Sequence, residues 1–222
     1  MQYQLTIAID SAGLSNIYNA HQYVTIVKSV VSNPLADGNL PIAWIAFQPL
    51  QTNLVSWMEN YTIYATSTVL QSGATISQTS VTGAPVQTGW TYTFASGQFA
   101  GAQGGAGSTY NMNNQQNGMF SFGLSQQAMV NNVQVNAPLN AMPVLYNEGA
   151  SFTPEETVSI FLSSSSNNGV VLSQVASNAL TVTLTSQNPN ASIGFNDTTN
   201  SFYLQTAAIM TPDAFARRLQ AV

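Results

Sequence analysis

The chain has 222 residues, of which only 5% are charged, and it contains no cysteine. Its eight acidic and three basic residues give a net charge of −5, so it lacks the clustered Lys and Arg that binding to nucleic acid requires. The absence of cysteine excludes disulfides, zinc–thiolate sites and thiol nucleophiles. We therefore expect one large domain with an uncharged polar surface and no nucleic-acid partner.

The N-terminal segment predicts a β-strand. Apolar side chains alternate at Tyr3, Leu5, Ile7 and Ile9, which is the period of a strand with one buried face. A basic region followed by a continuous apolar stretch is missing, so we expect no signal peptide and synthesis in the cytoplasm, followed by release or by assembly into an extracellular or virion structure. The most apolar short run, residues 41–50, is too short for a membrane helix, so no helical membrane span is expected.

Short segments with apolar and β-branched residues recur along the rest of the chain, separated by Asn, Gly, Pro and Asp. About ten short strands of this kind favour an antiparallel β-sandwich, of the jelly-roll or immunoglobulin-like type. After the first strand, the expected strands cover residues 23–31, 41–47, 60–68, 90–94, 120–124, 131–137, 158–162, 179–185, 191–195 and 201–205.

Residues 156–187 are expected to form a hairpin, because apolar and hydroxyl residues alternate on both sides of a turn rich in Ser, Asn and Gly. Val158 and Ile160 would face the core, while Thr157 would face solvent. A hairpin that spans a lipid bilayer needs about 9–11 alternating residues per strand. The clean alternation that ends at Leu162 is shorter than that, which weakens the interpretation as a membrane-inserting hairpin without removing it.

Two other segments are expected to differ from strands. Residues 97–118 are rich in Gly, Gln and Asn and predict a long loop or linker, without the glycine spacing of a phosphate-binding loop. The end of the chain, residues 211–222, predicts a short packing helix. Thr211 is a suitable N-cap there, and Phe215 and Leu219 are apolar residues four positions apart.

A weak internal repeat relates residues 1–108 to residues 109–222. Matching residues recur in the same order about 97 positions apart, among them Glu59 and Glu156. An old duplication would explain them, and so would chance in a sequence rich in Ser, Thr, Gln and Asn. We keep both explanations open, treat the whole chain as a single β-sandwich domain, and expect the two glutamates at equivalent strand entrances.

No pattern in the sequence predicts catalysis. His21 is the only histidine and no G-x-S-x-G motif occurs, so we expect this residue in a loop or at a strand end. Glu155 and Glu156 are adjacent, which points them to opposite faces if they lie in a strand. The segment from Thr153 to Glu156 predicts a capped turn that leads into a strand. We therefore expect no catalytic residues and no enzyme activity.

Metal binding finds equally little support. One histidine and no cysteine exclude the common zinc ligand sets. Oxygen ligands for calcium occur near Asp37 and Asp197, but each loop has a single carboxylate and lacks EF-hand spacing, and Asx turns explain both. We expect no metal site and no cofactor.

The function expected from this pattern is self-association. Sheet edges are usually protected by Lys and Arg, and this chain has only three such residues. Strands rich in Ser, Thr and Asn are able to pair across subunits. The sequence thus predicts a non-enzymatic structural β-protein that forms a homo-oligomer, as a subunit of a filament, shell, virion or inclusion.

The alternative is a lectin-like or pore-forming, toxin-like defence protein that binds a carbohydrate or a cell-surface receptor. Aromatic faces stack on sugars, while amides and carboxylates bind hydroxyl groups. Trp44 and Trp90 lie within strand patterns and are expected in the core, whereas Trp57 is expected to be exposed. The candidate ligand-binding residues are Trp57, Glu59, Asn60 and Tyr110.

Overall fold

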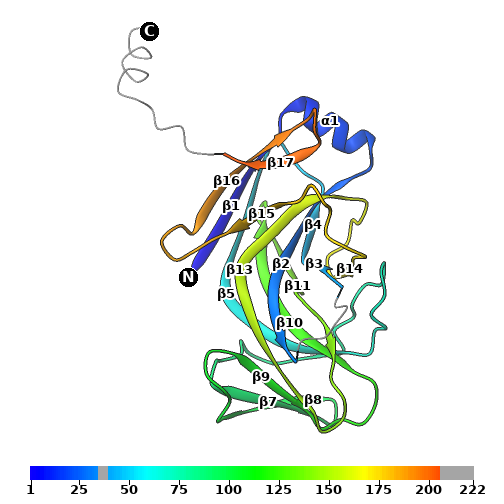
Figure 1. Cartoon of the computed structure of the whole chain (residues 1–222), viewed down its shortest axis with the longest axis vertical. Helices are drawn as coiled ribbons and strands as arrows, with labels where there is room; N and C mark the ends of the chain where they lie inside the picture. Colours follow the sequence, from blue (N-terminus) through cyan, green and yellow to red (C-terminus); the bar gives the residue numbers. More distant parts are fainter. Residues whose placement is uncertain (35–39, 206–222) are drawn as a thin grey trace.

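The computed structural model describes residues 1–34 and 40–205, and within them the chain is mostly β-strand with one short helix (Figure 1). The strands form several sheets, none of them closed. In chain order the elements are β1 (Gln2–Ala8), α1 (Ser11–Asn19), β2 (Tyr23–Asn33), β3 (Ile42–Ala43), β4 (Ile45–Phe47), β5 (Thr52–Thr66), β6 (Ser80–Val81), β7 (Trp90–Ala95), β8 (Gln98–Gln103), β9 (Tyr110–Asn114), β10 (Ser121–Val130), β11 (Val133–Pro138), β12 (Met142–Pro143), β13 (Gly149–Ser163), β14 (Val170–Val171), β15 (Leu180–Thr183), β16 (Asn190–Asn196) and β17 (Ser201–Leu204).

Two large sheets contain most of these strands. The first has eight strands in the order β11-β10-β5-β1-β16-β17, with β12 paired to β10 and β6 paired to β5. The second has seven strands in the order β4-β2-β13-β9-β7-β8, with β15 paired to β13. Pairing is antiparallel except between β1 and β16 and between β7 and β9, which are parallel. The expected wholly antiparallel arrangement is therefore wrong at these two pairs.

Both large sheets contribute side chains to one apolar core. The predicted inward residues of β1, namely Tyr3, Leu5 and Ile7, are all buried in it. Val158 and Ile160 of β13 are fully buried in the same core, as the alternation predicts. Strand side chains alternate between the two faces of a sheet, so each large sheet directs one face of apolar residues into this core. Burial of these residues stabilises both sheets.

Helix α1 was not expected from the sequence. Asp10 caps its N-terminus, accepting a hydrogen bond from the Gly13 amide at 2.7 Å. A Cβ at Gly13 would lie 2.8 Å from the Phe195 ring, so glycine permits the close approach of the helix to β16. Only Gly13 and Ile17 are buried in this nine-residue helix, and so short an apolar stripe gives a weak periodic signal.

The glycine-rich segment 97–118 is not a simple linker. It contains β8 and β9, which both pair with β7 in the second sheet. The prediction of a long loop is wrong here because small residues suit this sheet. Gly101 packs against the Tyr92 ring, where a Cβ would approach to 2.8 Å.

The expected hairpin at 156–187 is correct only in part. β13 and β15 pair antiparallel, from Thr157↔Thr183 to Ile160↔Leu180. The chain between them does not turn tightly, because β14 leaves the pair and forms a separate two-stranded sheet with β3.

β13 itself extends back to Gly149, so Thr153 and Glu156 lie inside a strand. The predicted capped turn at this place is wrong. Tertiary pairing with β2 and β9 extends the strand through it.

The two longest strands, β5 and β13, have 15 residues each, and β13 starts 97 positions after β5. Pairing of β5 with β10 breaks between Tyr61↔Gln126 and Trp57↔Ala128. Residues 58–60 of β5 therefore lie opposite the single residue 127, which is a special β-bulge with two extra residues. We call it the β5 bulge.

β13 has a matching irregularity, called here the β13 bulge. Its pairing with β2 breaks between Pro154↔Val30 and Val158↔Lys28, so residues 155–157 lie opposite residue 29. Glu59 and Glu156 are the central residues of the two bulges. The expectation that they lie at strand entrances is wrong, although their positions are equivalent. A common origin of the two halves stays a prediction.

Some expectations fall outside the described residues. The predicted helix at 211–222 and the candidate calcium ligand Asp37 are among them. In the part of the chain that the structure describes, no helix is both long and apolar enough to cross a membrane.

Candidate functional site

A buried ion pair joins the two strands that flank the β13 bulge. Lys28 on β2 has no exposed side-chain surface, and its Nζ lies 2.8 Å from each carboxylate oxygen of Glu156 on β13. The same ammonium donates to Gln126 Oε1 at 3.0 Å and to the Tyr61 hydroxyl at 3.2 Å. Because Tyr61 and Gln126 belong to the first sheet, the lysine connects the two large sheets through hydrogen bonds.

The Glu156 carboxylate has two further donors from β5. Trp57 donates its indole N–H to Oε2 at 2.7 Å, and Tyr61 donates its hydroxyl to Oε1 at 2.7 Å. The carboxylate thus accepts four hydrogen bonds, two from the ammonium and two from neutral donors. Within the described residues, no buried side-chain nitrogen or oxygen lacks a partner. We refer to Lys28, Glu156, Trp57, Tyr61 and Gln126 as the ionic cluster.

Aromatic rings complete the surroundings of the ammonium. Its nitrogen lies 5.6 Å from the Trp44 ring centroid, 5.4 Å from that of Trp57 and 5.2 Å from that of Tyr61, distances at which cations and ring faces attract. Burial lowers the pKa of Lys28 to about 8, against the opposing effect of Glu156. The side chain therefore stays protonated, and the ion pair stays formed, at neutral pH.

The tyrosines around the cluster are shifted in the other direction. Burial, followed by the nearby charge of Glu156, raises the pKa of Tyr61 well above its usual range. Burial also raises the pKa of Tyr3, whose hydroxyl donates to Glu59 Oε1 at 2.5 Å. Both hydroxyls therefore act as hydrogen-bond donors over the neutral pH range.

Gln126 links the ionic cluster to the β5 bulge. Its side-chain oxygen accepts from Lys28, and its Nε2 donates to the Met58 carbonyl at 2.7 Å. That carbonyl lies in the bulge, where pairing with β10 is interrupted. The amide of Gln126 thus provides a partner for the bulged backbone and keeps the bulge in register with the cluster.

Of the four predicted ligand-binding residues, one belongs to this cluster and two lie beside it. Trp57 belongs to it, and the expectation that it is exposed is wrong, since only 2% of its surface is accessible. Glu59 is exposed but held by Tyr3, and the half-buried Tyr110 ring lies 5.4 Å from the Tyr61 ring. Asn60 is exposed on the β5 bulge. Trp44 is fully buried as expected, whereas Trp90 is only partly buried.

Sequence reasoning missed three members of the cluster, namely Lys28, Tyr61 and Gln126. A signal for the first was present, because the lysine sits alone in an apolar segment, residues 23–31, that reads as a strand. A lysine in such a strand requires a buried counter-charge if its side chain faces the core. The identity of that partner depends on the sheet pairing, which the sequence does not give.

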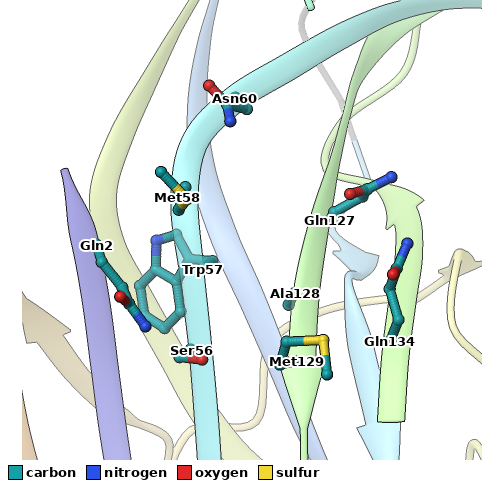
Figure 2. A pocket seen from close by; sticks show the side chains of 9 residues that line it. All are labelled: Gln2, Ser56, Trp57, Met58, Asn60, Gln127, Ala128, Met129 and Gln134. Atoms are coloured by element: carbon teal, nitrogen blue, oxygen red, sulfur yellow. The ribbon is translucent and has the colours of Figure 1, made fainter. Parts of the chain in front are cut away.

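A hollow lies on the outer surface of the first sheet beside the β5 bulge (Figure 2). It opens where the bulge separates β5 from β10, and its volume is about 230 Å³. Its lining comes from four neighbouring strands, β1, β5, β10 and β11. The residues are Gln2, Ser56, Trp57, Met58, Asn60, Gln127, Ala128, Met129 and Gln134. We call it hollow 1.

A second hollow of about 220 Å³ adjoins it, and we call it hollow 2. Asn60 and Gln127 line both hollows, so the two meet at the β5 bulge. The remaining lining residues of hollow 2 are Tyr61, Thr62, Gly83, Ala84, Pro85, Ser125 and Asn136. Neither hollow is lined by a charged residue.

The remaining chemical candidates are placed apart from these features. His21 lies in the exposed turn between α1 and β2, in a left-handed backbone conformation, as a loop residue should. Glu155 is exposed while its neighbour Glu156 points inward, as their adjacency in a strand predicts. Across the described ranges, no three His, Cys, Asp or Glu side chains lie close enough together to hold a metal ion.

Comparison with protein-family models, with curated proteins and with solved structures found no match for this chain.

Proposed function

We propose that the protein is a non-enzymatic structural subunit that associates with copies of itself through the edges of its sheets. In this proposal the two large sheets pack as a β-sandwich in a single domain. The observation that carries it is the position of Lys28, the only Lys or Arg side chain in the described part of the chain. It is completely buried and paired, so it protects no sheet edge.

β8 is the edge best suited to such pairing. It ends the second sheet, has six residues and contains neither a charge nor a proline. Phe99 faces the core and packs on Phe94, while Ala100 and Ala102 are exposed. Small side chains at these positions leave the strand backbone accessible to a strand from another subunit.

β11 offers a second edge, at the end of the first sheet. It also lacks charged residues, and its first residue, Val133, is 64% exposed. A subunit with one free edge on each sheet is able to contact two neighbours, which suits a filament or a shell better than an isolated dimer.

The saturated ionic cluster supports a structural rather than a catalytic role. Both oxygens of Glu156 and the ammonium of Lys28 are engaged within the protein. A general base or acid needs a free site directed at a substrate. The cluster instead forms hydrogen bonds between the two sheets that an assembling subunit needs to keep aligned.

Substitutions on β8 test the proposal. The double variant Ala100→Lys with Ala102→Lys places two charges beside the edge without entering the core, so it should reduce the particle mass toward the 23.6 kDa of one chain. Gln48→Lys, an exposed loop position with one added charge, is the control and should leave the mass unchanged. The proposal is wrong if the β8 variant keeps the wild-type mass, measured by light scattering after size-exclusion chromatography.

A further inference from the structure

We propose that hollows 1 and 2 together bind a neutral, hydroxyl-rich ligand of the oligosaccharide class, centred on Asn60 and Gln127. This site does not depend on assembly, because both hollows lie on the outer surface of one chain.

The strongest observation is a set of amide side chains that the fold does not use. Within the described residues, the five amides that line the hollows form no hydrogen bond with another part of the protein. They are Gln2, Asn60, Gln127, Gln134 and Asn136. Each offers two donors and one acceptor oxygen, the complement of a sugar hydroxyl that both donates and accepts.

Several other amides in this protein bond to the fold itself. Asn53 bonds the Ile7 and Leu50 carbonyls, Asn114 bonds the Val144 carbonyl, and Asn140 bonds Ser32 and the Leu124 amide. These side chains stabilise loops and bulges in the fold. At the two adjoining hollows, by contrast, five amides without such bonds gather around the β5 bulge.

Charge and shape narrow the class of ligand. No lysine, arginine or acidic residue lines either hollow, so an ionic ligand would find no counter-charge there. Met58 is 53% exposed and Met129 is 40% exposed, and they give hollow 1 an apolar side that suits the C–H face of a sugar ring. Hollow 2 has Pro85 in the corresponding role.

The volumes of the two hollows indicate a ligand with more than one sugar ring. Hollow 1 has a volume of about 230 Å³ and hollow 2 of about 220 Å³. Both are smaller than binding sites for drug-sized ligands, which measure roughly 300–1,000 Å³. One small ring would fill either of them. Because Asn60 and Gln127 line both, a ligand of two or three linked rings would use the pair together and contact the shared amides from both sides.

The ionic cluster holds the β5 bulge from the inner side of the sheet. Gln126 holds the Met58 carbonyl from the inner side at 2.7 Å, so the backbone that carries Asn60 is fixed by the ionic cluster before any ligand arrives. A fixed site reduces the entropy lost on binding. The ionic cluster thus positions the site without contacting the ligand.

Saturation-transfer difference NMR with maltotriose, cellotriose and N,N′,N″-triacetylchitotriose tests the proposal, because the method works for monomers and for large assemblies alike. At least one of these neutral probes should give a signal from its ring protons. Asn60→Ala with Gln127→Ala should weaken its affinity by about tenfold or more, since four or more hydrogen-bonding groups are lost. Gln71→Ala, an exposed glutamine outside both hollows, is the matched control.

Single substitutions locate the ligand further. Gln134→Ala affects hollow 1 alone and Asn136→Ala hollow 2 alone, so each should weaken binding less than the double variant. The proposal is overturned if none of the three saccharides binds, or if a bound saccharide keeps its affinity in the Asn60→Ala, Gln127→Ala protein. Near-ultraviolet circular dichroism verifies that the variants stay folded, which exposed positions should allow.

Discussion

The two bulges, one in each of the long strands, use the same backbone device with opposite results. At the β13 bulge, Glu156 turns inward and meets Lys28, so both of its carboxylate oxygens are engaged inside the protein. At the β5 bulge, Glu59 stays exposed and accepts a hydrogen bond from Tyr3, and the neighbouring amides line two surface hollows. The β13 bulge therefore stabilises the fold, and the β5 bulge exposes amide side chains at the surface.

The difference comes from the residue on the opposing strand. Lys28 pairs with Val158 beside the β13 bulge, and the residue at the equivalent place on β10 is Gln126, which pairs with Tyr61. The strand opposite the β13 bulge thus supplies a cation, which pairs with Glu156. The strand opposite the β5 bulge supplies only a neutral amide, so Glu59 has no cationic partner there. A single buried cation thus converts one of two similar bulges into a structural centre.

Removal of the cation should have the largest effect. Lys28→Met leaves the Glu156 carboxylate partly buried without its counter-charge, and we expect a loss of about 3–5 kcal/mol in the free energy of unfolding. The double variant Lys28→Met with Glu156→Gln should be more stable than Lys28→Met, since no buried charge remains. Urea unfolding measures both. A Lys28→Met protein within about 0.5 kcal/mol of wild type would contradict the role of the cluster.

Removal of one neutral donor should have a smaller effect. Trp57→Phe keeps an aromatic ring but deletes the N–H that Glu156 accepts, so we expect a loss of about 1.5–3 kcal/mol. Trp90→Phe, at a half-buried position, is the matched control and should cost less. Equal losses in the two variants, compared by urea unfolding, would mean that ring volume and not the hydrogen bond decides the outcome.

The stability of the protein at alkaline pH should depend on Lys28 and on the buried tyrosines in opposite directions. The pKa of Lys28 is lowered to about 8, so between pH 8 and its unfolded value near 10.4 the unfolded chain holds more protons and stability should rise gently. The pKa values of Tyr3, Tyr61 and Tyr64 are raised, so their contribution is complete below the unfolded value near 10 and is lost above it.

The unfolding midpoint in urea, followed across this pH range, should therefore pass through a maximum near pH 10. Tyr61→Phe should make the fall above the maximum shallower, because one of the shifted hydroxyls is gone. A steady decline from pH 8 upward in the wild-type protein would contradict the assignment of burial as the main influence on Lys28.

The open bulge should tolerate change best. Glu59→Gln retains an acceptor for the Tyr3 hydroxyl, so its free energy of unfolding should stay close to that of wild type. Glu59→Ala removes the acceptor, and we expect a loss of about 0.5–1.5 kcal/mol in the free energy of unfolding. Thermal unfolding compares the two. If Glu59→Ala destabilised the protein as much as Lys28→Met, the two bulges would not differ in the way described above.

The sequence allowed the strand pattern to be predicted more fully than the site. Alternation identified the buried faces of β1 and β13 because each strand has one core face, as Leu5 and Ile160 show. It failed for β8, where glycine and alanine suit tight packing on Tyr92, and for α1, whose buried stripe is short. In both cases tertiary contacts outweigh local propensity.

Ligand binding by the residues selected from the sequence stays a prediction. Glu59 and Asn60 were selected for their residue types, and the latter does lie at the hollows. The selection of Trp57 as an exposed residue failed because its orientation depends on the strand register, which places it opposite Tyr3 on the inner face. The partner of Glu156 was missed for the same reason, since 128 residues separate it from Lys28.

The particle mass of the wild-type protein, measured by light scattering over a range of concentrations in neutral buffer, tests self-association most directly. The proposed function predicts a mass that is a multiple of 23.6 kDa and rises with concentration, because free edges recruit further subunits. A mass of 23.6 kDa at every concentration would contradict it.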